Sequence, residues 1–539
     1  MLRNKILKHA ASLFAFAIIL TFMSCEDDVI DLQPVSQLSD ITAFATPERC
    51  ELSVIGAYDA IQCGIYNGSY SRGYPFGAAS IIQGEMRGQD MNLTAVFYDI
   101  TYSSTYSTTT ANNRYYWEAS FEAINRINTV IRGIGGAVEN SIITEEQGNA
   151  YKGELLFLRA LTYHSLLIHF AYPVNINSNN NYGLPLYLNA NNTPSDVEES
   201  MKIGRSTVQE TYAQILKDLT DAESLFSTDD KNGANGITRV SKGSIIALKT
   251  RVYLHKRDWP KVIEEAKRLV PGTAAPFKSP IGDYELETSP ATPFLSYSNN
   301  TESIFSVENN SDDNGSVNGA MAAMMSARTG GRAIVTSSPT IYNTSYWLAD
   351  DKRRDLLYYS SAYNYYYCDK YQNVTTREEY APIIRYAEVL LNYSEAVLRQ
   401  GGNNTLALEL LNAVRNRSLA NPADQKYGAA DFADTKAFLD AILWERRIEF
   451  HGEGRRWEDI HRLANDDISP SGGIPAKIDY SRAKGKDNFV VGGEVKEEWF
   501  SPNRKFIPYT DRRFLWPIPV GDLIRNPTLA AQQNEGWGN

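Results

Sequence analysis

The chain has few of the residues that carry most catalytic and metal chemistry. Its 539 residues include only 4 cysteines and 6 histidines. His164 and His169 lie five positions apart and so point to different faces of a helix, which excludes the i, i+4 pair that binds zinc. His-Glu-x-x-His, Gly-x-Ser-x-Gly and Walker-type phosphate motifs are also missing from the sequence. We therefore expect no catalytic residues, no metal site and no cofactor.

The chain also lacks a basic patch and a long apolar run beyond its first residues. Its net charge of −11 argues against binding nucleic acid through the phosphate backbone. The apolar run at 10–23, about 14 residues, is too short to span a bilayer as a helix. It follows a basic start and ends at Cys25, which is typical of a lipoprotein signal peptide. We predict a signal peptide at 1–24, lipidation at Cys25 and an extended tether over 25–45.

The other cysteines give no disulfide framework. Cys50 and Cys63 fall on one predicted helix, about 20 Å apart at 1.5 Å per residue, which is too far for a bridge. Cys368 has no nearby cysteine in the sequence. We interpret all three as small buried apolar residues.

Helical patterns dominate the predicted domain at 46–539. Thr144 and Gln147 form a capping box that opens a long helix to about residue 170. A second box at 206–209 starts a helix to about 226. Residues 241–256 with 258–270, and 382–400 with 404–418, read as helical hairpins of the tetratricopeptide type. The fold class is therefore mainly α, a helical-hairpin scaffold over about 46–270 and 380–465 with loop-rich insertions.

Three stretches interrupt this scaffold. Residues 64–112 are predicted to be loop-rich, and 466–539 form an irregular C-terminal segment whose insert covers 466–505. The insert at about 272–372 loses helical periodicity and crowds tyrosines together, in a chain that holds 33 of them. Loops on a stable scaffold are where binding surfaces are usually found. Tyrosine and tryptophan rings stack on sugar faces, so we expect a binding surface here.

The stretch 444–463 contains an unusual set of charges. Glu445 and Glu449 lie at i, i+4, where like charges repel by roughly 0.2–0.5 kcal/mol on an exposed helix. We expect Arg455, Arg456 or Arg462 to fold back onto these glutamates. The result would be a buried ion network that joins two helices.

Two long motifs resemble the C-terminal signatures of the SusD/RagB family of surface lipoproteins in the Bacteroidota. The first consists of Glu445-Arg446-Arg447 and Glu449, followed by Glu453-Gly454, Arg456-Trp457, Asp459-Ile460 and Arg462. The second consists of Leu515-Trp516-Pro517-Ile518-Pro519, Asn526-Pro527, Leu529 and Gln533-Asn534-Glu535-Gly536-Trp537. Phe157, Arg159-Ala160, Tyr163 and Leu166 match a further helix of the family. The acids at 26–28 are similar to the surface-export tag of such lipoproteins.

The resemblance implies a SusD-like fold with four helix pairs and a cell-surface position on the outer membrane. It implies a non-enzymatic protein that binds oligosaccharide as a lid on a SusC-like TonB-dependent transporter. Ligand contacts would come from the loop after the first helix and from the variable insert. The corresponding residues here are Arg87, Asp90, Asn92, Tyr98, Tyr102, Tyr342, Trp347 and Tyr365.

Three alternatives remain open from the sequence. The cargo could be an oligopeptide, because relatives in the family carry peptides. The protein could be a glycoside hydrolase that uses a carboxylate pair such as Glu85 and Asp90, or Asp312 and Asp313. It could also be a helical scaffold that binds only protein.

Overall fold

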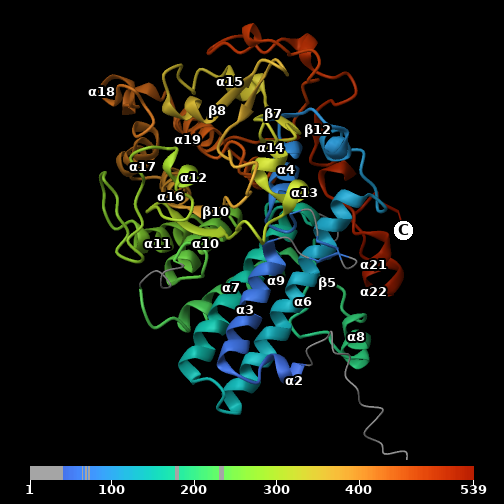
Figure 1. Ribbon diagram of the computed structural model, residues 1–539. Coiled ribbons are helices and arrows are strands. Elements are labelled where there is room, and N and C mark those ends of the chain that lie inside the picture. The colour runs from blue at the N-terminus through green and yellow to red at the C-terminus, as the bar shows by residue number, and fades with distance from the viewer. Residues whose placement is uncertain are drawn as a thin grey trace, which may run out of the picture.

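The computed structural model describes residues 40–62, 65–66, 69–70, 73–176, 181–229 and 236–538 (Figure 1). The predicted signal peptide, the predicted lipidation site Cys25 and Cys63 lie outside these residues. Cys50 and Cys368 are buried free thiols, as predicted. No helix within the described ranges combines the length and the apolar character that crossing a bilayer requires.

Long helices form one end of the molecule, at the bottom of Figure 1. α7 begins at the predicted capping box, where the Thr144 hydroxyl accepts from Gln147 N at 3.1 Å and Gln147 Oε1 accepts from Thr144 N at 3.1 Å. α9 begins one residue later than predicted, because Thr207 and Glu210 form its box. Both helices are thus confirmed. The helices of this end are α3 (Pro47–Gln62), α6 (Ala111–Glu139), α7 (Glu145–Phe170), α8 (Pro194–Ser200) and α9 (Val208–Ser224).

The end of the predicted tether is folded. Asp40–Ala43 form the short helix α2, and Phe44 is buried. A Cβ at Gly133 would lie 2.1 Å from the Phe44 ring, so glycine is required where this ring meets α6. The prediction that the chain is extended up to residue 45 is therefore wrong at its C-terminal end.

The two predicted helical hairpins are confirmed. α10 (Lys242–His255) pairs with α11 (Trp259–Leu269), and α16 (Tyr386–Gln400) pairs with α17 (Asn404–Asn416). α11 also packs against α16, so the hairpins are neighbours although more than a hundred residues separate them (Figure 1). α19 (Thr435–Glu449) packs against α16, and α20 (Arg456–Arg462) follows it. Between them Gly452 and Gly454 have φ of +78° and +80°, a conformation that glycine adopts readily and that separates α19 from α20.

Short antiparallel strand pairs connect the loop-rich parts of the described chain. β3 pairs with β7 through Met91–Ser337 and Leu93–Val335, which brings the segment after the first helices against the variable insert. The pairs are β1 (Ile65–Tyr66) with β2 (Ser69–Tyr70), β3 (Met91–Leu93) with β7 (Val335–Ser337), β4 (Tyr182–Pro185) with β5 (Arg205–Thr207), β6 (Ser303–Val307) with β10 (Ala381–Arg385), β8 (Leu357–Ser360) with β9 (Tyr365–Cys368), and β11 (Gly473–Ile474) with β12 (Ile507–Pro508).

Small helices complete the fold, and α15 and α18 among them lie at the top of Figure 1. The segment 64–112, predicted to be loop-rich, contains the buried helix α4, so that prediction is wrong over 78–87. The remaining α-helices are α4 (Ala78–Arg87), α5 (Asp99–Tyr102), α12 (Thr292–Leu295), α13 (Ser316–Gly319), α14 (Met321–Met325), α15 (Pro339–Tyr342), α18 (Pro422–Gln425), α21 (Val520–Arg525) and α22 (Pro527–Ala530). The 3₁₀ helices are η2 (Val96–Tyr98), η4 (Lys352–Leu356), η5 (Ala429–Asp431), η6 (Lys486–Asn488), η7 (Glu497–Trp499) and η8 (Arg512–Phe514).

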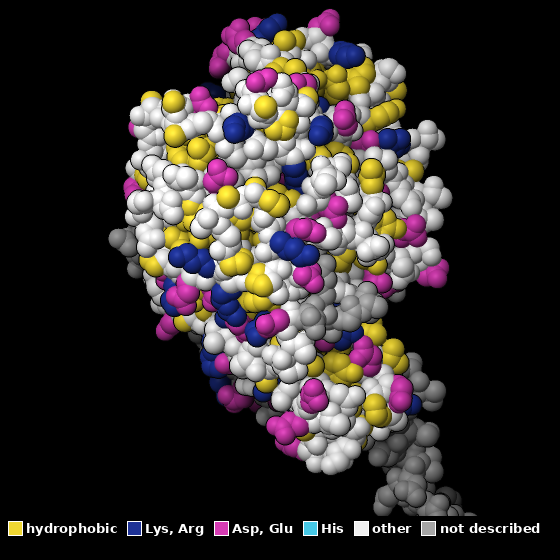
Figure 2. Space-filling view, turned by 90° about the vertical axis from the view of Figure 1, so that its left-hand side faces the viewer, with side chains coloured by type: hydrophobic (Ala, Val, Ile, Leu, Met, Phe, Trp, Pro, Cys, Tyr) yellow, Lys and Arg dark blue, Asp and Glu magenta, His cyan; other side chains and the backbone are white. Residues whose placement is uncertain are grey.

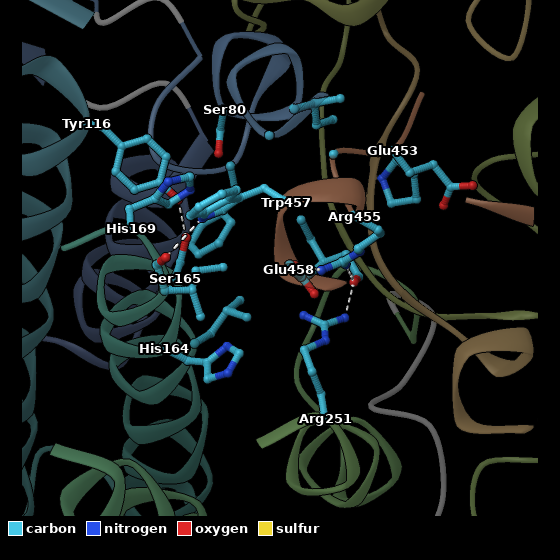
Figure 3. Close-up of a pocket in the computed structure, with 18 residues that line it drawn as sticks. Ser80, Tyr116, His164, Ser165, His169, Arg251, Glu453, Arg455, Trp457 and Glu458 are labelled. Carbon is cyan, nitrogen blue, oxygen red and sulfur yellow. Dashed lines mark hydrogen bonds and ion pairs between the residues drawn. The ribbon is translucent and has the colours of Figure 1, made fainter. Parts of the chain in front are cut away.

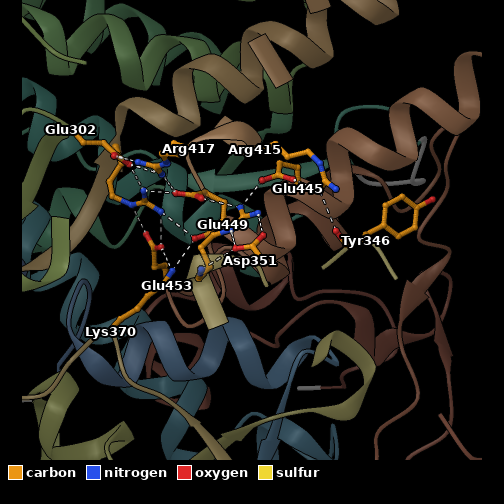
Figure 4. A network of polar contacts seen from close by, with 11 residues as sticks. Glu302, Tyr346, Asp351, Lys370, Arg415, Arg417, Glu445, Glu449 and Glu453 are labelled. Atoms are coloured by element: carbon orange, nitrogen blue, oxygen red, sulfur yellow. Dashed lines mark hydrogen bonds and ion pairs between the residues drawn. The ribbon is translucent and has the colours of Figure 1, made fainter. Parts of the chain in front are cut away.

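A buried ion network surrounds Glu445 and Glu449, as Figure 4 shows. Glu449 accepts from Arg385 at 2.8 Å, from Arg353 at 3.1 Å and from Arg417. Burial alone raises the pKa of Glu449, but these three arginines outweigh it and hold the pKa below its ordinary value. Glu445 accepts from Arg353 at 2.5 Å. The predicted network therefore exists.

The partners of the glutamates differ from the prediction. Arg455 pairs with Glu458, and Arg456 lies 3.5 Å from Asp90, so neither reaches Glu445 or Glu449. The glycine turn after α19 places both arginines away from Glu445 and Glu449. Arginines from the insert and from the second hairpin pair with these glutamates instead. α19 and α20 are joined elsewhere, because Asp459 accepts from Arg446 at 3.2 Å and from Arg462 at 2.8 Å.

Glu449→Gln removes the charge that three buried arginines share. We expect it to lower the free energy of unfolding by about 3–5 kcal/mol, because the arginines stay buried without their partner. Chemical denaturation at pH 7 measures this. The control is Asp221→Asn, which breaks an exposed pair with Lys217 and should cost about 0–1 kcal/mol. Equal effects of the two substitutions would contradict the role of Glu449.

Stability should also fall in mild acid, because five histidines are buried. Burial lowers the pKa of each one, to about 3 for His164 and about 4 for His451. The set is His164, His169, His255, His451 and His461. The unfolded chain binds protons at these rings near pH 6.5 and the folded chain does not, so stability is full above pH 6.5 and decreases as the pH falls below it. Glu85, whose pKa burial raises to about 8, acts in the opposite direction but binds at most one proton.

Denaturation at a series of pH values from 7.5 to 5 checks this expectation. The free energy of unfolding should decrease steadily toward pH 5. A flat or rising profile would show that the buried rings take up protons without unfolding.

Candidate functional site

The residues predicted to contact ligand are mostly buried. Seven of them are at most 2% exposed, namely Arg87, Asp90, Asn92, Tyr98, Tyr102, Trp347 and Tyr365. Tyr342 is half-buried and packs against Tyr366 and Phe489 with ring centroids 4.7 and 5.2 Å away. The structure therefore does not bring these side chains together on a surface.

Arg87 and Asp90 stabilise the interior instead. The Arg87 guanidinium lies 3.4 Å from the centre of the Trp457 ring and donates to the Phe514 carbonyl. Asp90 accepts from Arg447 Nε at 3.0 Å, which attaches the chain after α4 to α19. Both side chains thus contact residues of the motif at 444–463.

Asn92, Tyr102 and Tyr365 form a polar cluster beneath the surface. Asn92 donates to the Tyr365 hydroxyl at 2.8 Å, and the Tyr102 hydroxyl donates to Asn92 Oδ1 at 3.1 Å and to the Ile478 carbonyl at 2.8 Å. These bonds join the segment after α4, the variable insert and the C-terminal insert. The alternation in β9 turns Tyr365 and Tyr367 inward, and this explains why the tyrosine tract is less exposed than its composition suggests.

An interior cavity near α4 and α20 is too small for a sugar. It has a volume of about 60 Å³ and lies between Tyr116, His169, Trp457 and Arg455 (Figure 3). Ligand pockets usually measure roughly 300–1,000 Å³. This space suits a few water molecules rather than a substrate.

The best candidate site lies between α5 and the C-terminal segment. A cavity of about 310 Å³ opens there, and a hollow of about 520 Å³ adjoins it. Pro502, Lys505 and Phe506 line both spaces, so the two are neighbours, and we call them together the depression around Phe506. The cavity is lined by Tyr102, Ser103, Ser104, Ile474, Pro475, Lys477, Pro502, Asn503, Arg504, Lys505, Phe506, Ile507 and Arg513.

The depression combines an exposed ring with fixed hydrogen-bond donors. Phe506 is 49% exposed, whereas its neighbour Ile507 points into the core. Arg504 is held in place because it donates to Ser103 Oγ at 2.7 Å and to Asp99 at 2.8 Å. An apolar ring beside several donors suits a ring-shaped polar ligand with one apolar face.

Two other hollows lie beside the long helices and fit a sugar less well. One of about 330 Å³ contains Tyr58, and one of about 620 Å³ contains Tyr187. Both tyrosines are half-buried, and the Tyr58 hydroxyl donates to Glu154 at 2.5 Å. Neither ring offers the open face that Phe506 does.

Of the residues predicted to contact ligand, only Tyr102 lines this depression. Tyr102 was predicted to bind ligand, and it lines the wall of the cavity with its hydroxyl turned inward. Phe506 was missed, although period-2 alternation from Phe506 through Ile507 and Pro508 of β12 could have placed it outside.

The carboxylate pairs considered for hydrolysis have no suitable setting. Glu85 and Asp90 are buried, and Gly454 N donates to Glu85 at 2.9 Å. Asp312 and Asp313 sit in an exposed turn in which Asn310 accepts from both of their backbone amides. Within the described ranges no group of acids, histidines and cysteines has the arrangement of a metal site.

Comparison with known proteins agrees with this fold. A family model described as SusD family matches residues 334–537, and one described as starch-binding associating with outer membrane matches residues 65–254. The first match contains both long motifs that resemble the family signatures. The chain belongs to the SusD family.

Its relatives are distant but cover most of the chain. SusD-like protein P2 of Formosa agariphila is 23% identical in an alignment of 459 residues that covers 77% of this chain and 79% of that protein. A SusD superfamily protein from Bacteroides fragilis superimposes with a TM-score of 0.71 at 26% identity, covering 90% of this chain and 99% of the other. Surface glycan-binding protein A from Bacteroides uniformis gives 0.66 at 20% identity, covering 91% and 99%. The mainly α, SusD-like fold predicted from the sequence is confirmed.

Trp347 was predicted to bind ligand. Because its side chain is buried, we expect a substitution to lower the stability of the fold. Its ring packs with Ile341 and Ile448, and Arg354 lies 4.5 Å from the ring centre. Trp347→Ala should therefore lower the free energy of unfolding by about 3–5 kcal/mol through the cavity it leaves. Thermal and chemical denaturation measure this. A variant that is as stable as the parent chain would contradict the burial of Trp347.

Proposed function

We propose that this protein binds oligosaccharides at the cell surface through the depression around Phe506. In this proposal Cys25 carries the lipid anchor, and the protein delivers its ligand to a SusC-like TonB-dependent transporter as a non-catalytic lid. Membership of the SusD family supports it, as does the match to a family model described as starch-binding associating with outer membrane. A structural relative is named as a surface glycan-binding protein.

The exposed Phe506 ring carries the proposal at the level of residues. A sugar ring stacked on it would place its hydroxyls beside Asn503, Arg504 and Lys505, which line the same cavity. The volumes of about 310 and 520 Å³ suit a short stretch of an oligosaccharide rather than a single atom or ion. Peptide capture by strand addition needs an extended edge, and β11 and β12 are two residues each.

The lining of the cavity also favours binding without cleavage. Glycoside hydrolysis requires two carboxyl groups on opposite sides of the bond to be broken. The cavity lining contains no aspartate or glutamate among its residues. Glu497 and Glu498 line the adjoining hollow and are consecutive residues on η7.

Phe506→Ala tests the site. The variant should bind oligosaccharide about 2- to 12-fold more weakly, since aromatic stacking contributes roughly 0.5–1.5 kcal/mol beyond area burial. Affinity gel electrophoresis against a panel of plant and algal polysaccharides identifies a ligand, and calorimetry then compares the variants. Leu52→Ala is the control, because Leu52 is an exposed apolar residue on α3.

Two outcomes would contradict the proposal. One is a folded Phe506→Ala variant with the affinity of the parent chain. The other is the appearance of shorter oligosaccharides when the parent chain is incubated with its ligand and the mixture is chromatographed.

A further inference from the structure

The cavity beside α5 has a charge opposite to that of the whole protein. The chain carries a net charge of −11, yet every charged side chain that lines this cavity is cationic. These side chains are Lys477, Arg504, Lys505 and Arg513. On the face that Figure 2 shows, acidic and basic side chains are interspersed. The cavity is therefore a local exception rather than a sample of the average surface.

Arg504 and Arg513 are held in place by hydrogen bonds that use only some of their N–H donors. Arg504 donates to Asp99 and Ser103 through Nη2 and Nε, and Arg513 donates to Asp511 through Nη2 at 2.7 Å and Nε at 2.9 Å. In both cases one edge of the guanidinium faces a carboxylate. The Nη1 of either arginine has no hydrogen-bond partner among the described residues, so this donor is available to a ligand.

Lys505 supplies the charge that no carboxylate balances. It is exposed, it lines both the cavity and the adjoining hollow, and it has no ion pair among the described residues. Lys477 contributes less, because its amine is buried and donates to the Gly88 carbonyl. Burial, together with Arg456 and Arg87, also lowers the pKa of Lys477 well below its ordinary value. The positive charge that meets a ligand thus comes from Lys505, Arg504 and Arg513.

The adjoining hollow has a different character. Glu497, Glu498 and Arg482 line it together with Phe500 and Phe506. Carboxylates here would repel an anion, while the rings and polar groups suit an uncharged sugar. The depression is therefore cationic on one side of Phe506 and mixed on the other.

We propose that the cavity binds the anionic group of an acidic oligosaccharide, a uronate carboxylate or a sulfate ester. This inference rests on the proposed function and narrows its ligand class. A sugar stacked on Phe506 would place the anionic group of the next sugar between Lys505, Arg504 and Arg513. Oxyanions with two or three acceptor oxygens match guanidinium donors in geometry as well as in charge.

Affinity gel electrophoresis with matched acidic and neutral polysaccharides tests the inference. The acidic set is polygalacturonate, alginate and carrageenan, and the neutral set is starch, laminarin and xylan. At least one acidic polymer should retard the protein more strongly than every neutral one. Raising the salt concentration to 0.5 M should weaken this retardation, because the charges in the depression are accessible to solvent.

Substitution of Lys505 tests whether the preference for an acidic polymer arises in this cavity. Lys505→Gln should weaken binding of the acidic polymer about tenfold, as expected when a hydrogen bond to a charged group is lost, and Lys505→Glu should weaken it further. Lys267→Gln on α11 is the matched control, since Lys267 is also exposed and has no ion pair among the described residues. All three variants change exposed side chains, and their melting temperatures confirm that they are folded.

Chemical modification of the retained polymer separates the two anions. Methyl esterification should abolish the preference if the group is a carboxylate, and desulfation should abolish it if the group is a sulfate. Retention of neutral polymers alone would overturn the acidic ligand while leaving the proposed function intact. Retention that survives both modifications or is unchanged in Lys505→Glu would overturn it too. If no polymer of either set is retained, the proposed function fails as well.

Discussion

The buried contact between Glu449 and three arginines is the interaction on which the rest of this structure depends. The arginines come from distant parts of the chain, Arg353 from η4 in the variable insert, Arg385 from the end of β10 and Arg417 from the end of the second hairpin. Glu302 accepts from Arg385 at 2.5 Å and also from Arg417, so the residue directly before β6 joins the same network. Because charges buried this deeply are tolerated only when they are paired, the network fixes how the insert sits on the helical scaffold.

The same principle positions the candidate site. Asp90 attaches the chain after α4 to Arg447 on α19, and two residues later Asn92 contacts both Tyr102 and Tyr365. Tyr102 in turn holds the Ile478 carbonyl of the C-terminal insert. Each link is buried, and the last one forms the wall of the cavity. The depression around Phe506 therefore rests on a continuous set of polar contacts that begins at the family signature. A ligand would meet side chains that are already in place, which reduces the entropy lost on binding.

Local signals in the sequence predicted most of the scaffold, and long-range contacts explain what it missed. The capping box at Thr144 and the two hairpins depend on residues within a few positions, so their patterns are visible in the sequence. The like-charged pair Glu445 and Glu449 indicated a network, but Arg353 lies 96 positions before Glu449, and no local pattern identifies it. The candidate site was predicted by analogy with a family whose loops diverge, and aromatic content alone does not distinguish a surface ring from a buried one. Trp347 and Tyr365 face the interior, while Phe506, which lies in a basic loop, faces solvent.

We propose that one depression, between α5 and the segment around β12, captures the ligand while the tyrosine-rich insert acts mainly as support. Hydrogen–deuterium exchange with and without a saturating oligosaccharide tests this most directly. The account predicts added protection in peptides that cover 99–106 and 500–513, with little change over 342–347 and 363–367. Protection confined to the tyrosine-rich insert, with residues 500–513 unchanged, would contradict it.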